Sequence, residues 1–235
     1  MWGDDPIRFR ADRCQSLKTT PGQRENEMAS FPQRVQDNIL PLSVGDTLPE
    51  VFTEWLFTER AYDYGKPTKT CELCEQESLR YHFEIRNRFT QKTLWVGSHC
   101  ILKYQVPVFE QGKEVTDVDA KKHLNHLMKK MQMDSCLAAL QRLAGSEGSS
   151  ILQLALDYYR QHATLSPKHA YSIFWRLRSH RIDHNPSAFK VNLKPAELQE
   201  ELRGMVSGHV HTFWPALTSK QKELASSLGH TPPAT

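Results

Sequence analysis

The chain has 235 residues, a length that suits one large domain or two small ones. Its formal net charge of +3 is mild and does not by itself indicate a nucleic-acid partner. Its five cysteines are an odd number, which argues against a disulfide scaffold and favours the reducing cytoplasm. No apolar run approaches the roughly 18 residues that cross a bilayer, and the acidic start lacks the apolar segment of a secretory signal. We therefore expect a cytoplasmic protein without membrane contact.

Residues 1 to 38 are rich in Arg, Gln, Asp, Pro and Ser and show no sustained hydrophobic period, so we expect disorder. Met28, within this stretch, is a second candidate for the first residue of the native protein. Residues 39 to 112 are predicted to form a module of one helix and a zinc-binding hairpin. The helix is expected to begin at Thr47, with Pro49 in its first turn, and to extend an apolar face to Tyr62.

Three cysteines at two ends of a short segment predict a metal site. Cys71 and Cys74 have the C-x₂-C spacing that supplies two zinc ligands from one turn. Two predicted strands, at residues 79 to 85 and 93 to 97, form a hairpin that brings Cys100 back to this pair. The sequence thus predicts a Zn²⁺ ion held by three cysteines.

Two histidines compete for the fourth zinc position. His99 is preferred, because a bend at the preceding Gly97 and Ser98 would turn it toward the cysteines. His82 is the alternative, about 10 Å further along the hairpin at the usual strand rise. Four protein ligands would close the site and leave no position for a reacting water, so we expect a structural role for the metal.

Residues 113 to 229 read as a helical region with a glycine- and serine-rich break at residues 145 to 150. A long helix is predicted from about residue 116 to Gly145. Others follow over residues 151 to 161, after the caps Ser166 and Thr218, and after Pro195. A short strand is expected at residues 189 to 193, and residues 230 to 235 are a tail. The predicted class is α+β and mostly helical, with a small zinc-bound β-hairpin followed by a helical region.

Basic and aromatic residues occur together in two places, a combination that suits phosphates and stacked bases. Aromatic residues stand near both sets, although those of the hairpin would equally suit its inward face, with the arginines merely solvating the outside. In residues 160 to 194, Asp183 is the only acid. The candidate nucleic-acid ligands are Arg80, Arg86, Arg88 and Lys92 on the hairpin, and Lys168, Arg176, Arg178, Arg181 and Lys190 in the helical region.

Residues 71 to 104 resemble a zinc-ribbon or knuckle unit of poorly characterised bacterial, plasmid and phage proteins. The similarity lies in the C-x₂-C knuckle, the strand that begins Arg80-Tyr81, and the return Val96-Gly97-Ser98-His99-Cys100. Some of those proteins have a cysteine where Ser98 stands here. The resemblance implies zinc and a bacterial or mobile-element context, and it implies no reaction.

Three functional hypotheses follow. The first is a non-enzymatic zinc protein that binds nucleic acid through the hairpin and the basic helical segment. The second is a protein-interaction adaptor in which zinc is purely structural. A nuclease or another nucleic-acid-processing enzyme is the weaker third, because the chain has no His-Asn-His spacing, no glycine-rich phosphate loop and no His-Glu-x-x-His motif.

Overall fold

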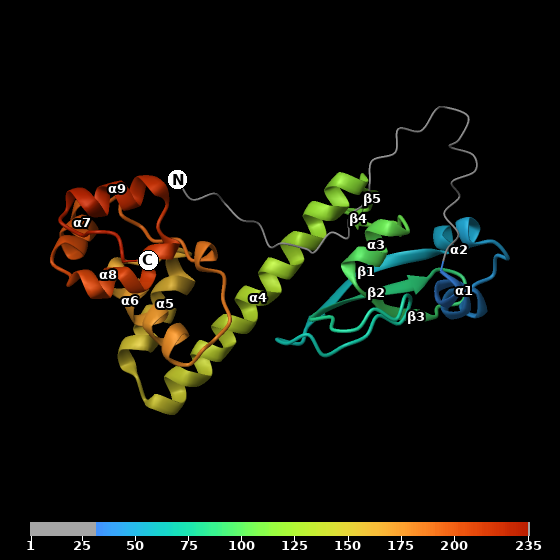
Figure 1. Cartoon of the computed structure of the whole chain (residues 1–235), viewed down its shortest axis with the longest axis horizontal. Coiled ribbons are helices and arrows are strands. Elements are labelled where there is room, and N and C mark those ends of the chain that lie inside the picture. The colour runs from blue at the N-terminus through green and yellow to red at the C-terminus, as the bar shows by residue number, and fades with distance from the viewer. Residues whose placement is uncertain (1–31, 235) are drawn as a thin grey trace.

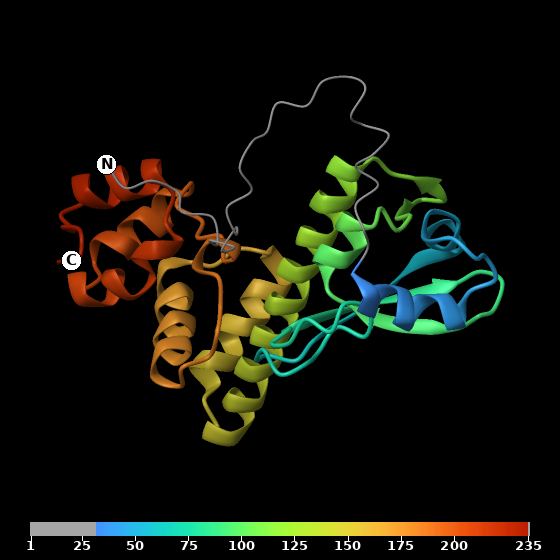
Figure 2. The same ribbon diagram turned by 45° about the vertical axis from the view of Figure 1, so that its right-hand side comes forward.

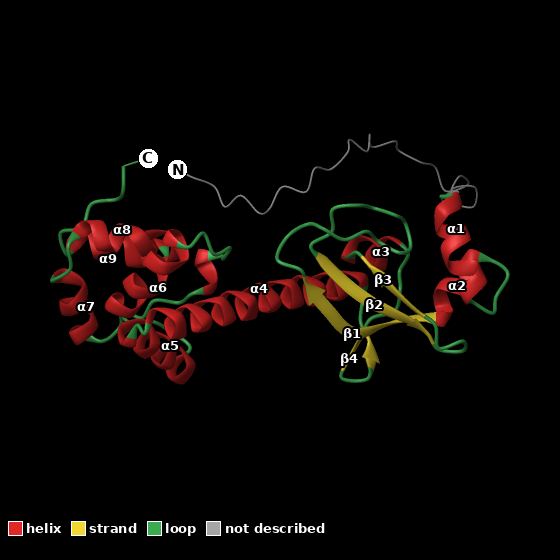
Figure 3. Cartoon of the chain, turned by 90° about the horizontal axis from the view of Figure 1, so that it is seen from below, coloured by secondary structure: helices red, strands yellow, loops and turns green. Residues whose placement is uncertain are grey.

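The computed structural model describes residues 32 to 234, which form a mostly helical α+β fold (Figure 1). A small sheet with its covering helices lies at one end, a cluster of short helices lies at the other, and one long helix joins them (Figure 3). The predicted fold class is confirmed. Most of the stretch predicted to be disordered lies outside the described residues, but its last part forms the helix α1, Gln33–Ile39.

The sheet has three antiparallel strands, β1 (Trp55–Asp63), β2 (Tyr81–Asn87) and β3 (Thr93–Val96), in the order β1-β2-β3. Tyr62 of β1 lies opposite His82 of β2, and Glu84 of β2 lies opposite Trp95 of β3. One face of the sheet, with Phe83 and Ile85, is buried in the first hydrophobic core. The elements of this part are α1, η1 (Leu40–Leu42), α2 (Leu48–Glu54), β1 (Trp55–Asp63), β2 (Tyr81–Asn87), β3 (Thr93–Val96), α3 (Ser98–Lys103), β4 (Phe109–Glu110) and β5 (Lys113–Glu114).

The prediction of one helix as far as Tyr62 was wrong, because α2 ends at Glu54 and β1 begins at the next residue. The buried Glu54 carboxylate accepts hydrogen bonds from the amides of Val44 and Gly45 and from the side chain of Asn87 at the end of β2. These bonds satisfy a buried charge and fix the end of the helix to the sheet. A tertiary contact of this kind outweighs local helical periodicity.

The long helix α4 (Asp117–Glu147) contributes to two separate cores. Its first half places Ala120 and Leu124 in the core under the sheet. Its second half places Leu140 and Ala144 in the core of the C-terminal helices. The two packing units therefore meet within one continuous helix. The predicted break at residues 145 to 150 is a tight corner instead, where α4 ends at Gly148 in the left-handed conformation.

The C-terminal helices surround a second core that includes Phe174, Phe189 and Phe213. Side chains of Ser166 and Thr218 cap α6 and α9, as their sequence positions predict. The strand predicted at residues 189 to 193 was wrong, since Val191 makes only an isolated bridge to Leu165. The elements are α5 (Ser150–His162), α6 (Pro167–Ser179), η2 (Pro186–Ala188), α7 (Ala196–Arg203), α8 (Ser207–Phe213), η3 (Trp214–Ala216) and α9 (Ser219–Ser227).

An ion-pair network joins the sheet to the C-terminal half. The Arg80 guanidinium donates two hydrogen bonds to Asp63, at 2.7 and 2.9 Å, and a third to Asp183. Asp183 also accepts a hydrogen bond from Gln132 of α4 at 2.9 Å. The loop between β1 and β2 accordingly lies beside α4 (Figure 2). Arg80 and Asp183 together therefore join the end of β1, the middle of α4 and the loop after α6.

We expect Asp63→Asn to lower the free energy of unfolding at pH 7 by about 1.5 to 3 kcal/mol, because it weakens a buried, charge-assisted contact. Burial opposes ionisation of Asp63, but the bonds from Arg80 lower the pKa of this carboxyl below its usual value. The stabilisation is therefore present above the pKa of an unfolded aspartate and is lost as the pH falls through the lower folded value.

Urea unfolding of both proteins between pH 7 and pH 2.5 checks this prediction. The difference between wild type and Asp63→Asn should shrink below about pH 4. Glu200→Gln is the matched control, because the Glu200 carboxylate pairs with Arg203 on the open surface of α7 and contributes little. A difference that is independent of pH would contradict the ion-pair explanation.

Candidate metal centre and basic surface

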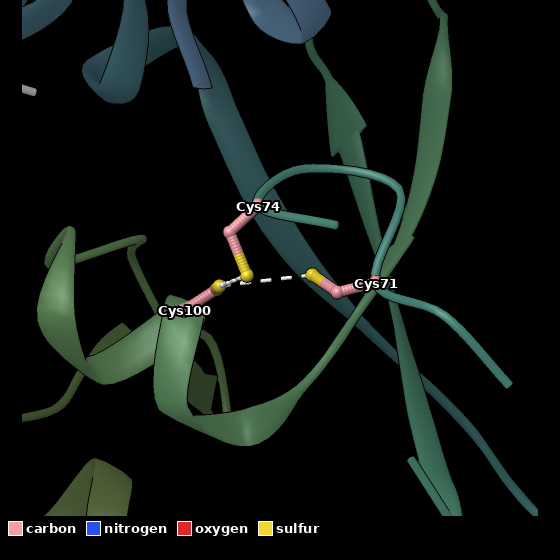
Figure 4. A group of neighbouring side chains, drawn as sticks. All are labelled: Cys71, Cys74 and Cys100. Carbon is pink, nitrogen blue, oxygen red and sulfur yellow. Dashed lines mark hydrogen bonds between the residues drawn. The ribbon is translucent and has the colours of Figure 1, made fainter. Parts of the chain in front are cut away.

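Cys71, Cys74 and Cys100 point toward one another from two elements (Figure 4). The first two stand in the loop before β2, and Cys100 stands in the first turn of α3. Their sulfur atoms all lie within 4.8 Å of one another. The Sγ atom of Cys100 is 3.7 Å from that of Cys71 and 3.2 Å from that of Cys74. The predicted three-cysteine cluster is therefore present.

These distances fit a shared metal ion better than a disulfide. Zinc–sulfur bonds of about 2.3 Å in a tetrahedron place two sulfurs roughly 3.8 Å apart. A disulfide needs about 2.05 Å between its sulfurs. The separation of Cys71 and Cys100 matches the tetrahedral value, and that of Cys74 and Cys100 needs only a small side-chain adjustment. The three side chains can thus coordinate one tetrahedral metal ion without a change of fold.

The knuckle is held to the edge of β3 by backbone contacts. The amide of Glu72 donates to the carbonyl of Trp95 at 3.0 Å, and the amide of Trp95 donates to the Glu72 carboxylate at 2.6 Å. The loop closes on itself through a bond from the Cys71 amide to the Gln76 carbonyl. The fully buried Leu73 anchors it in the first core. The knuckle is therefore part of the sheet module.

The pKa values of the three thiols differ because the sulfurs are crowded. Hydrogen bonding from Cys100 lowers the pKa of Cys71 to about 5 against the effect of burial, and the amides of Leu73, Cys74 and Gly97 add to the lowering. Burial raises the pKa of Cys74, and donation to Cys71 together with burial raises the pKa of Cys100. Neighbouring negative charges disfavour one another. A divalent cation among the sulfurs would remove this repulsion and displace the remaining protons.

Neither predicted histidine completes the cluster. Within residues 32 to 234, no histidine nitrogen or carboxylate oxygen joins the three sulfurs in a group with all distances below 4.8 Å. His99 is exposed in the first turn of α3. His82 is buried, its pKa is lowered by that burial, and its Nε2 atom has no hydrogen-bond partner. Of the other cysteines, Cys136 lies in the second core and Cys14 lies outside the described residues.

Most of the predicted nucleic-acid ligands on the hairpin have protein partners. Arg80 is held by two aspartates. Arg86 lies 3.4 Å from the Glu84 carboxylate. Arg88 donates to the carbonyl of Thr53 at 2.7 Å and lies over the ring of Phe89. Lys92 is exposed. The hairpin therefore presents fewer unpaired cations than its composition suggests.

Of the cations predicted as nucleic-acid ligands in the helical region, some have ion-pair partners and others do not. Lys168 lies 4.0 Å from Glu201, and Arg176 lies 3.3 Å from Glu147. The remaining three predicted ligands are exposed and form no ion pair with any residue in the described part of the chain. These are Arg178, Arg181 and Lys190.

The structure exposes aromatic residues that sequence reasoning placed elsewhere. Tyr62 and Tyr64 lie at the end of β1 and beyond it, with 51% and 40% of their surfaces exposed. The prediction of a helix as far as Tyr62 did not place these residues on a sheet. The alternation of buried Trp55 and Phe57 with half-buried neighbours is the strand signal that could have revealed β1. Phe83, by contrast, is buried in the core.

Comparisons of the chain with models of protein families, with curated proteins and with solved structures find no match. The resemblance to zinc-ribbon units depends on the motif residues alone. Between residues 32 and 234, none of the helices combines the length and the apolar character that crossing a bilayer requires.

We expect the purified protein to contain about one zinc ion per chain and Cys100→Ser to lose it, because this change removes one of the three sulfur ligands. Metal analysis of protein purified without added metal measures this. Cys136→Ala is the matched control, since it removes a buried thiol in the other core and should keep the ion. Wild-type protein that is folded and free of metal would contradict the prediction.

The metal affinity of two further variants identifies the fourth ligand. His82→Ala and His99→Ala remove the two candidates one at a time. Loss of the true ligand should weaken metal affinity at least tenfold, and the other variant should keep wild-type affinity. Competition with a chromogenic chelator measures both affinities. Equal affinity in both variants would exclude both histidines.

Proposed function

We propose that this chain is a non-enzymatic zinc protein that binds nucleic acid. The observation that carries the proposal is the meeting of three cysteine sulfurs between the knuckle and α3. A metal at this point would tie the loop between β1 and β2 to the helix behind the sheet. It would thus fix the position of the knuckle relative to α3.

Zinc is the metal that best suits this donor set. Thiolates from a C-x₂-C turn are soft ligands, and zinc accepts them in tetrahedral geometry. In this proposal the fourth ligand is His99 or His82, either of which has to approach the sulfurs more closely than it does in the structure, and the site has a structural role. The kinship with zinc-ribbon units, the bacterial or mobile-element context and the cytoplasmic location stay predictions from the sequence.

The nucleic-acid part of the proposal is supported by charge. Arg178, Arg181 and Lys190 are exposed and have no ion-pair partner among the residues described. Unpaired cations of this kind attract phosphates and release counterions on binding. Arg88 of the hairpin lies over the exposed ring of Phe89, a pairing that suits a base as well as a phosphate.

We expect the protein to bind nucleic acid in a salt-sensitive manner and Arg178→Gln with Lys190→Gln to weaken that binding. Each lost phosphate contact should reduce the slope of log K against log salt by roughly 0.7 to 0.9. Fluorescence anisotropy with labelled oligonucleotides between 50 and 300 mM salt measures the slope.

The control is Lys220→Gln with Lys222→Gln, which makes the same change of charge on α9, outside the proposed surface. This control should retain the wild-type slope. No binding of single- or double-stranded DNA or of RNA at low salt would overturn the proposal.

A protein partner is the second candidate, and one observation favours it. Ile151 and Leu154 lie three residues apart on α5, and 65% and 62% of their surfaces are exposed. Exposed apolar pairs of this kind mark interaction surfaces more often than isolated residues do. Nothing in the described part of the chain favours the weaker alternative of a nuclease, and we do not propose it.

A further inference from the structure

Among the helices that the structure describes, none packs against the outer face of the three-stranded sheet (Figure 3). Helices α3 and α4 lie on the inner face, where Phe83, Ile85 and Val96 join the first core. Side chains alternate along a strand, so His82, Glu84 and Arg86 of β2 belong to the opposite face. The register places Tyr62 beside His82 and Trp95 beside Glu84 on that face.

Three aromatic side chains gather on this outer face. The ring centroid of Tyr62 lies 5.2 Å from that of Trp95 and 6.3 Å from that of Tyr64. The buried imidazole of His82 supports them from below, 5.5 Å from Tyr64 and 6.5 Å from Trp95. Tyr62 and Tyr64 keep about half of their surfaces open to solvent. Because the ring of Tyr62 is tilted by 51° to that of Trp95 and by 39° to that of Tyr64, the rings form a stepped platform on which successive bases can stack separately.

Cations lie directly on these rings. The Arg60 guanidinium is 5.7 Å from the centre of the Trp95 ring, and the Lys69 ammonium is 4.8 Å from the centre of the Tyr64 ring. Arg60 and Arg86 both contact the single buried carboxylate of Glu84, which leaves an excess of positive charge on the face. Glu72, at the edge of β3, is engaged by the Trp95 amide.

We propose that this outer sheet face binds single-stranded nucleic acid, with bases stacked on Tyr62, Tyr64 and Trp95 and phosphates on Arg60 and Lys69. The inference rests on the proposed function and names its partner class and its binding residues. Neither tyrosine, and neither of these cations, was among the ligands predicted from the sequence.

The chemistry of the face favours a single strand over a duplex or a protein. Exposed rings can stack only on bases whose faces are free, and paired bases inside a duplex have none to offer. The centre of a protein–protein interface is depleted in lysine, whereas here Lys69 lies over a ring of the platform. A polyanion with free aromatic faces satisfies both the charges and the rings.

Binding of labelled 15-nucleotide DNA and RNA strands, and of the corresponding DNA duplex, tests this inference. We expect wild type to prefer the single strands. Tyr62→Leu with Tyr64→Leu should weaken single-strand binding by roughly 5- to 150-fold for each base that loses its ring, and should leave weak duplex binding unchanged. The DNA and RNA arms show which sugar the face accepts.

Phe109→Leu is the matched control, because it removes another exposed ring, on β4, that lies outside the platform. Circular dichroism and metal content establish that each variant is folded. If the double variant binds single strands as wild type does, or if wild type prefers the duplex, the inference is wrong while the proposed function stands. If no nucleic acid binds at all, the proposed function fails with it.

Discussion

Crowding of three sulfur atoms in a buried space is the constraint on which the sheet module depends. Cys71 and Cys74 come from the knuckle and Cys100 comes from α3, and their thiols cannot all ionise next to one another. A cation would relieve that repulsion and turn an unfavourable contact into a crosslink. Hydrogen bonds with Trp95 and the burial of Leu73 hold the knuckle at the edge of β3, and the crosslink would fix it to α3 as well. The outer face of the sheet owes its shape to the same loop, which contributes Tyr64 and Lys69.

The two halves of the molecule use different means of support. The sheet side combines an apolar core with the cysteine cluster and with buried charges such as Glu54, whose acceptor oxygens are all occupied. The C-terminal side uses apolar packing among short helices, of which α6 and α9 have side-chain caps. The ion pair of Arg80 and Asp183 links the two sides. The sheet side therefore adds buried polar contacts to an apolar core of its own.

The sequence predicted the features that depend on local chemistry. The C-x₂-C pair, the strands around residues 81 to 96, the long helix and the caps Ser166 and Thr218 all have short-range signals. Features that depend on distant partners were missed. The end of α2 is decided by hydrogen bonds of Glu54 with Asn87 and with the amides of Val44 and Gly45. Because the predicted helix ran past this point, the exposure of the tyrosines near the end of β1 was missed as well. The engagement of Arg80 with Asp183, 103 residues away, has no local signature.

The continuity of α4 sets the relative position of the sheet and the C-terminal helices. Each residue of an α-helix adds about 1.5 Å of length and 100° of rotation. A single residue inserted near the middle of α4 would keep both cores intact but turn one half of the molecule by more than a quarter turn. Asp183 would then face away from Arg80, and the outer sheet face and the cations of α6 would no longer point in their present directions. The length of α4 therefore sets the distance and the relative direction of the two surfaces that we propose bind nucleic acid.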